Sequence, residues 1–126
     1  MKHLIIASCI FAFALCGTIV AETMMENKTK ELITLSKELK YTVSNENTIR
    51  SGEILSEIEE GWEKVKKPLL LVLNHNDVDN VDMALMLTRA SVAEWDKDIC
   101  YQNASVLCFY LDELLDTEKL SLENIL

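Results

Sequence analysis

The sequence predicts an all-α fold: an antiparallel bundle of three to four helices that follows an N-terminal hydrophobic segment. Three observations support this prediction. Residues 4–21 carry no charged side chain. Beyond them, apolar residues recur at alternating steps of three and four, a spacing that places them on one face of a helix. This second part has only Gly52, Gly61 and Pro68 as strong turn formers, too few for a fold rich in β-turns.

The N-terminal segment has the layout of an export signal. Lys2 precedes the apolar run, and the acidic, polar part of the chain begins at Glu22. One interpretation is a signal peptide, residues 1–21, cleaved after Ala21. The other is an uncleaved membrane anchor, because 18 apolar residues are close to the length that spans a bilayer. Both interpretations make residues 22–126 an extracytoplasmic helical domain, since the positive charge stays inside.

Four apolar stripes follow in order, and polar stretches at residues 44–48, 74–77 and 96–98 separate them. The first stripe is loose, with Met25, Leu32, Leu35, Leu39 and Val43. The predicted core of the other three stripes is Leu55, Ile58, Trp62, Val65, Leu69, Val72, Val81, Leu85, Val92, Trp95, Leu107 and Leu111. Successive helices with short connections favour an antiparallel bundle. The fourth helix is expected to end near Thr117 and Glu118.

Pro68 interrupts the second stripe. Proline lacks a backbone donor and its ring clashes with the carbonyl four residues earlier, so we expect a kink or a fresh helix start there. The run LLLVL follows at residues 69–73. Because it is apolar on every side, it is expected to be the most buried part of the bundle.

The stretch NHND, residues 74–77, contains the one histidine of the exported part. A zinc site needs three or four ligands, and His75 has no second histidine near it. An EF-hand loop that starts at Asp77 fails because Val81 and Thr88 occupy ligand positions. We therefore expect Asn74, His75 and Asp77 to form a structural corner. His75 is expected near the C-terminus of the second helix, where it stabilises the corner, and Asp77 is expected to cap the third helix.

Charge and cysteine content argue against a nucleic-acid partner and against an intramolecular disulfide. The chain has 12 basic and 21 acidic residues; without Lys2 the exported part keeps 11 basic residues, a formal charge of about −10. Such a surface repels phosphate backbones, so no nucleic-acid partner is expected. Cys100 and Cys108 lie ~12 Å apart along one helix, too far for a disulfide. We expect them to be buried apolar side chains, and their reactivity stays an open question.

The chain resembles a bacterial family known as domain of unknown function 4363. The likeness is carried by the N-terminal apolar segment after a lysine, by GEILSEIEEGWEKVKKPLLLVLNHNDVDNVDMAL at residues 52–85, and by the closing LSLENIL. It covers essentially the whole chain. The resemblance implies a small all-helical protein held at the outer face of the membrane in Gram-positive bacteria, and it implies no reaction. Pro68 departs from the unbroken helix that the resemblance implies, which puts the straightness of the second helix in question.

These observations favour a membrane-tethered, non-enzymatic protein with a structural or interaction role, accessory to a membrane protein or self-associating through its helices. The alternative is a secreted soluble binding protein, released by cleavage near Ala21. A metal-dependent enzyme that uses His75 is a weaker alternative. No cofactor and no metal are expected.

Overall fold

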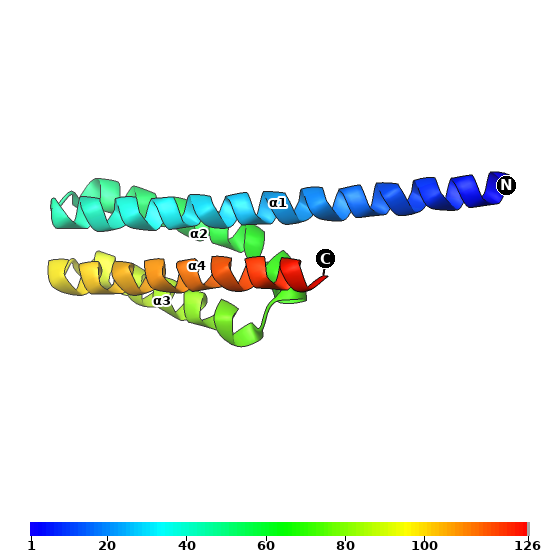
Figure 1. Cartoon of the computed structure of the whole chain (residues 1–126). Helices are drawn as coiled ribbons and strands as arrows, with labels where there is room; N and C mark the ends of the chain where they lie inside the picture. Colours follow the sequence, from blue (N-terminus) through cyan, green and yellow to red (C-terminus); the bar gives the residue numbers. More distant parts are fainter. Residues whose placement is uncertain (126) are drawn as a thin grey trace.

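The computed structural model of this protein consists of four helices (Figure 1): α1 (Lys2–Ser44), α2 (Thr48–Val72), α3 (His75–Glu94) and α4 (Lys97–Ile125). It describes residues 1–125, except the side chains of Glu22, Leu122, Asn124 and Ile125. No strand occurs within that range. The predicted all-α bundle is confirmed.

Consecutive helices run antiparallel and form a bundle at one end of α1 (Figure 1). Helix α1 packs against α2 and α4, and α3 packs mainly against α4, while the contact between α2 and α3 is the smallest of the four. The N-terminal half of α1 extends past the bundle as a single rod. The hydrophobic segment and the first bundle helix are therefore one continuous helix of 43 residues.

The three connections are short and locally capped. Residues 45–47 lie within the first predicted polar stretch, whereas residues 73–74 and 95–96 each begin one residue before the predicted one. The Asn47 side chain accepts a hydrogen bond from the Arg50 backbone N–H at 3.1 Å and caps α2. The Asp96 side chain accepts from the Ile99 N–H at 3.3 Å and does the same for α4. Helix α3 ends at Trp95, which adopts a left-handed conformation with φ 47°. That conformation is unusual for a bulky residue and reverses the chain without a glycine.

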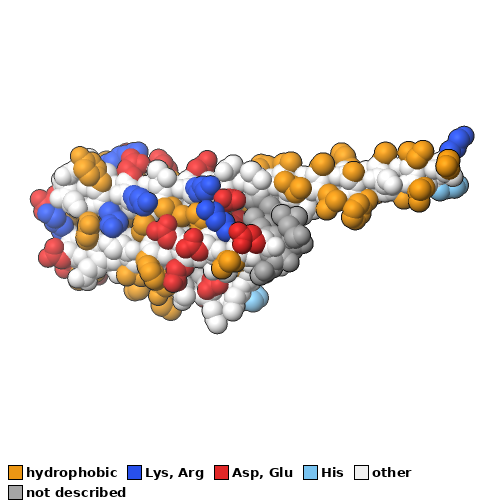
Figure 2. All heavy atoms as spheres, in the orientation of Figure 1, with side chains coloured by type: hydrophobic (Ala, Val, Ile, Leu, Met, Phe, Trp, Pro, Cys, Tyr) orange, Lys and Arg blue, Asp and Glu red, His pale blue; other side chains and the backbone are white. Residues whose placement is uncertain are grey.

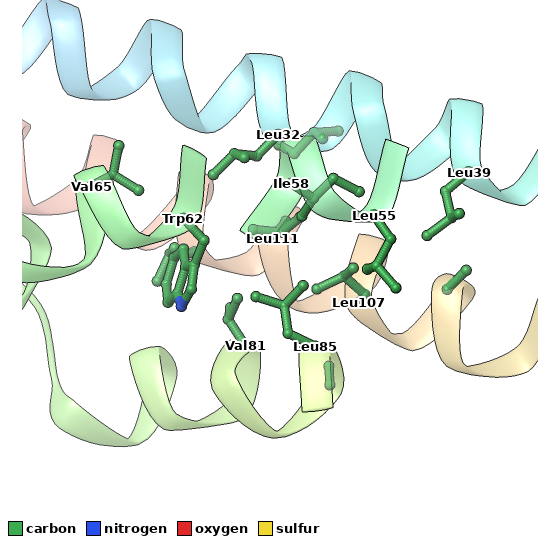
Figure 3. Close-up of a cluster of buried hydrophobic side chains, with 14 of the residues drawn as sticks. Leu32, Leu39, Leu55, Ile58, Trp62, Val65, Val81, Leu85, Leu107 and Leu111 are labelled. Atoms are coloured by element: carbon green, nitrogen blue, oxygen red, sulfur yellow. The ribbon is translucent and has the colours of Figure 1, made fainter. Parts of the chain in front are cut away.

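The core is made by inward-facing side chains from all four helices (Figure 3). Nine of the twelve residues predicted for it are buried: Leu55, Ile58, Trp62, Val65, Leu69, Val81, Leu85, Leu107 and Leu111. Val92 and Trp95 are half-buried and pack against this cluster. Val72 is 41% exposed, so its assignment to the core was wrong.

The apolar run at residues 69–73 also differs from the expectation. Leu69 and Leu73, four residues apart and therefore on one face, are buried, whereas the Leu71 side chain is 87% exposed. The reason is position: the run lies at the end of α2, where no neighbouring helix covers the outer side. Helix α2 continues through Pro68, so the expected fresh start is absent, although the Lys64 carbonyl necessarily lacks the N–H of residue 68.

Helix α4 is longer than predicted. It does not end at Thr117 and Glu118 but continues to Ile125. Both residues have helix-compatible side chains, and no glycine or proline follows them. The end of α4 is thereby carried back along α1 towards the apolar half of that helix (Figure 1).

Gly61 sets the distance between α1 and α2. A Cβ atom at this position would lie 2.9 Å from Leu32 Cδ2, which is closer than van der Waals contact allows. Leu32 is itself buried, so its side chain would have to shift within the packed core to make room. Gly52, nearer the start of the same helix, has nothing within 4 Å of its virtual Cβ.

These two glycines allow a matched test of the helix spacing. We expect Gly61→Leu to lower the free energy of unfolding by about 1–3 kcal/mol, the usual cost of overpacking. Gly52→Leu should be neutral or stabilising by up to about 1 kcal/mol, because it only gains helix propensity. Urea unfolding followed by circular dichroism measures both. Equal effects of the two substitutions would show that α1 does not approach α2 closely at Gly61.

Candidate functional site

The α2–α3 corner contains the residues that the sequence singled out. Leu73 ends α2 in an extended conformation, and α3 begins at His75. The Asn74 side chain accepts a hydrogen bond from the Asn76 N–H at 3.0 Å, and Asp77 lies in the first turn of α3. A carboxylate in this position is favourable because of the exposed N–H groups at a helix start. The stretch is thus a tight helical hairpin.

Two of the predicted roles at this corner need correction. Asn74, and not Asp77, is the N-cap of α3. His75 is the first residue of α3 and not part of the end of α2. Its side chain is exposed. The sequence did not distinguish the two assignments, because Asn74 and Asn76, on either side of His75, are both good N-cap residues.

No group of three or more His, Cys, Asp or Glu side chains that could hold a metal ion occurs among residues whose placement is described. His75 and Asp79 are four residues apart and share one face of α3, but Asp77 lies on another face, which leaves too few ligands for a metal ion there.

Trp62 connects α2 to α3 through a polar contact that the sequence did not suggest. Its buried indole Nε1–H donates to Asp82 Oδ1 at 2.7 Å, and the other oxygen of Asp82 pairs with Lys66 Nζ at 2.7 Å. Arg89 of α3 also forms an ion pair with Glu59 of α2. A buried indole N–H needs an acceptor, so Asp82 explains how Trp62 is placed in the core.

A shallow groove lies between α1 and α2 beside Gly61. Its volume is about 220 Å³, below the roughly 300–1,000 Å³ of typical small-molecule sites. Its rim carries both signs of charge, from Lys28 and Lys64 and from Glu31, Glu57 and Glu60. The groove follows from the close approach at Gly61, and neither its size nor its charge favours one class of ligand.

The most unusual polar group of the bundle is Glu118 of α4, whose side chain is 1% exposed. Its Oε2 lies 3.2 Å from the hydroxyl of Thr29 on α1, and its Oε1 has no hydrogen-bond partner among the described atoms. Thr29 is also buried. An ionised carboxylate in such a place is costly, because burial removes its hydration without a compensating charge.

Burial raises the pKa of the Glu118 carboxyl above its ordinary value, and the nearby Glu26 carboxylate adds to this effect; the Thr29 contact opposes it. The Thr29 hydroxyl lies 3.0 Å from the Met25 carbonyl oxygen and 3.2 Å from Glu118 Oε2. It has a single proton for these two acceptors, so the hydrogen bond that Glu118 accepts is weak. Burial therefore prevails, and the pKa of Glu118 stays raised.

The sequence contained a signal for Glu118. The fourth stripe runs through Leu107, Leu111 and Leu114, and the next step of four is Glu118. Because the helix was expected to end there, the carboxylate was interpreted as part of its polar terminus. The stripe continues, and a charged residue type at a core position of a helix is the feature that would have identified it.

Cys100 and Cys108 are both buried, and neither forms a disulfide. Cys100 belongs to the core cluster, and the Cys108 thiol lies 3.9 Å from Asp112 Oδ2 on the same helix. Cys9 and Cys16 are exposed on the apolar half of α1. The structure brings none of the four thiols together.

Comparison with known families adds one decisive observation. A family model described as a domain of unknown function, DUF4363, matches residues 19–125. The chain belongs to the DUF4363 family. The match covers the whole bundle and begins within the last residues of the apolar segment. A search of curated proteins and a search of solved structures gave no significant match.

Glu118 gives a pH-dependent prediction. An acid whose pKa is raised in the folded state destabilises the protein as pH rises above its unfolded value, and this penalty disappears at lower pH. Glu118→Gln should therefore raise the free energy of unfolding at pH 7 by about 1–3 kcal/mol, because the amide replaces an ionisable group in a buried site. The gain should shrink towards zero near pH 4.

Glu113→Gln is the matched control, since Glu113 is an exposed glutamate on the same helix. It should change stability by less than about 0.5 kcal/mol at either pH. Urea unfolding at pH 4, 5.5 and 7 measures both variants. A Glu118→Gln variant that is less stable than wild type at pH 7 would mean that the carboxylate is ionised and solvated in the native protein.

Proposed function

We propose that this DUF4363 protein is a membrane-tethered helical bundle, held on the outer side of the membrane by the apolar half of α1, with a structural or interaction role. The observation that supports the tether is the continuity of α1. Its apolar window is long and apolar enough to cross a bilayer and is 0% buried by the bundle. Figure 2 shows apolar side chains around this rod and acidic side chains only on the bundle.

The dimensions fit a single span. Residues 4–21 of a helix are about 27 Å long, close to the ~30 Å hydrocarbon core of a bilayer. The one charge before the apolar run is Lys2, which favours a cytoplasmic N-terminal side. The acidic bundle would then lie outside. A signal sequence near an N-terminus has the same properties, so cleavage after Ala21 and secretion is the alternative.

The interaction role rests on an exposed apolar face across α3 and α4, here called the α3–α4 face. It consists of Met83, Met86, Leu87, Val106 and Phe109, each at least 44% exposed. Asn103 Nδ2 donates to the Leu87 carbonyl at 3.2 Å, which fixes the two helices side by side at this level. In Figure 2, apolar side chains gather near the lower edge of the bundle, where Figure 1 places α3.

This face suits a partner protein better than a second copy. Methionine and phenylalanine are adaptable, high-area contact residues. The exported part carries a formal charge of about −10, so two copies repel each other, while a partner with a basic rim is attracted. We therefore propose an accessory role beside another membrane protein. Catalysis has no part in this proposal.

The tether predicts membrane retention that depends on the apolar half of α1. Wild type should stay in the membrane fraction after a carbonate wash, and its intact mass should include residues 1–21. Phe11→Asp should release it or block insertion, because a charge at the centre of a span costs about 2.5–3.5 kcal/mol. Ile49→Asp, an exposed apolar residue outside the segment, should leave retention unchanged. A mature protein that starts at Glu22 would support the secreted alternative.

The α3–α4 face predicts a partner that is lost on specific substitutions. Tagged wild type, solubilised from its native membranes with mild detergent, should retain a stoichiometric partner. Met86→Glu with Phe109→Glu should reduce the recovered partner at least about tenfold, the loss expected from burying a charge in an apolar contact. Ile49→Glu should retain it. The role at this face would be disproved if both variants recovered the same proteins.

A further inference from the structure

The end of α2 exposes an unusual amount of apolar surface. Leu71 is 87% exposed and Val72 is 41% exposed. Among the large apolar side chains described between residues 23 and 121, none is more exposed than Leu71. The bundle therefore places a leucine at its tip, beside a corner that is otherwise polar, where water offers it no favourable contact.

The contacts between α1 and α2 fix the level of this tip. The Ser51 hydroxyl donates a hydrogen bond to Thr42, and Leu32 lies against Gly61. Ten residues towards the N-terminus of α1 therefore correspond to ten residues towards the C-terminus of α2. Leu71 lies ten residues after Gly61, and Glu22 lies ten residues before Leu32. Leu71 and Val72 are thus level with the junction at which the uncharged half of α1 begins. Figure 1 shows the α2–α3 corner reaching that level.

This junction is where the proposed tether would leave the hydrocarbon core, because 18 residues of helix span about 27 Å of it. Side chains at the same level lie in the headgroup region. Lys67, exposed and four residues before Leu71, shares its face of α2. A lysine behind an apolar tip extends its ammonium towards lipid phosphates while its stem lies on apolar surface.

We propose that the α2–α3 corner docks on the surface of the membrane that anchors the chain, with Leu71 and Val72 inserted among the lipid headgroups. The bundle is then held at two points and lies against the bilayer at a fixed tilt. This inference rests on the proposed tether. The apolar side chains carry the contact: Asp77 and Asp79, one turn away at the start of α3, oppose binding through anionic lipid.

Leu71 could instead be covered by a partner protein. The two alternatives differ in whether lipid or protein surrounds its side chain. The test uses the full chain with Cys9→Ala and Cys16→Ala, reconstituted in phosphatidylcholine vesicles. Cys100 and Cys108 are buried and should take up no thiol label, which the parent variant checks. A fluorophore is attached at Leu71→Cys or at Ile49→Cys. Ile49 is 77% exposed and lies at the opposite end of the bundle, which makes it the matched control.

We expect a label at position 71 to be quenched by a nitroxide on the upper acyl chain and to be shielded several-fold from aqueous iodide, relative to the label at position 49. High salt should not reverse this, because the contact is apolar. Equal iodide quenching at both positions would overturn the docking. Shielding from iodide without nitroxide quenching would also overturn it, since a protein would then cover the tip.

A third label, on native Cys9 with Cys16→Ala, separates this inference from the tether. Nitroxide quenching at Cys9 together with free iodide access at position 71 would refute the docking and leave the tether intact. Absence of nitroxide quenching at Cys9 would refute both. Circular dichroism of each labelled variant confirms that the bundle is folded, which is expected because positions 49 and 71 are exposed.

Discussion

The structure depends on one constraint: a single unbroken helix, α1, has an uncovered apolar first half and a second half that packs in the bundle. Residues 2–44 form α1 without a turn or a proline, although the first half is apolar on all sides and the second half is amphipathic. The second half must therefore find partners that leave the first half uncovered. It does so by packing against α2 and α4, whose ends stop near the junction. The orientation of the apolar half therefore fixes that of the bundle in this structure, because one helix runs through both.

The remaining side of the bundle is held together differently. The contact between α2 and α3 is small. Its polar links include Trp62 with Asp82, Lys66 with Asp82, and Arg89 with both Ser56 and Glu59. Partly exposed ion pairs contribute little, typically below about 1 kcal/mol each. The indole hydrogen bond has a different role, since it allows the largest buried side chain to lie in the core without an unsatisfied donor. Trp62 thus joins this weaker side to the rest of the core.

The sequence was sufficient for what is determined locally. Caps such as Asn47 and Asp96 depend on a few neighbouring residues, and the apolar stripes depend only on helical spacing, so the helices and most core positions were predictable. The contact of Glu118 with Thr29 and the close approach of Leu32 to Gly61 were not, because each involves a residue of α1 that is far away in sequence. Leu71 was misjudged for a similar reason. Apolar composition shows that a segment avoids water, but not whether a protein or another apolar phase covers it.

The pairing of α1 with α4 also has a consequence for how the chain folds during synthesis. The first helix made is completed only by the last one, and the bond between Thr29 and Glu118 joins residues 89 positions apart. Translation at roughly 5–20 residues per second leaves the buried face of α1 half covered for several seconds. During that interval α1 and α2 form a hairpin with one open apolar side, which a chaperone, an insertion machinery or another nascent chain could occupy before α4 arrives.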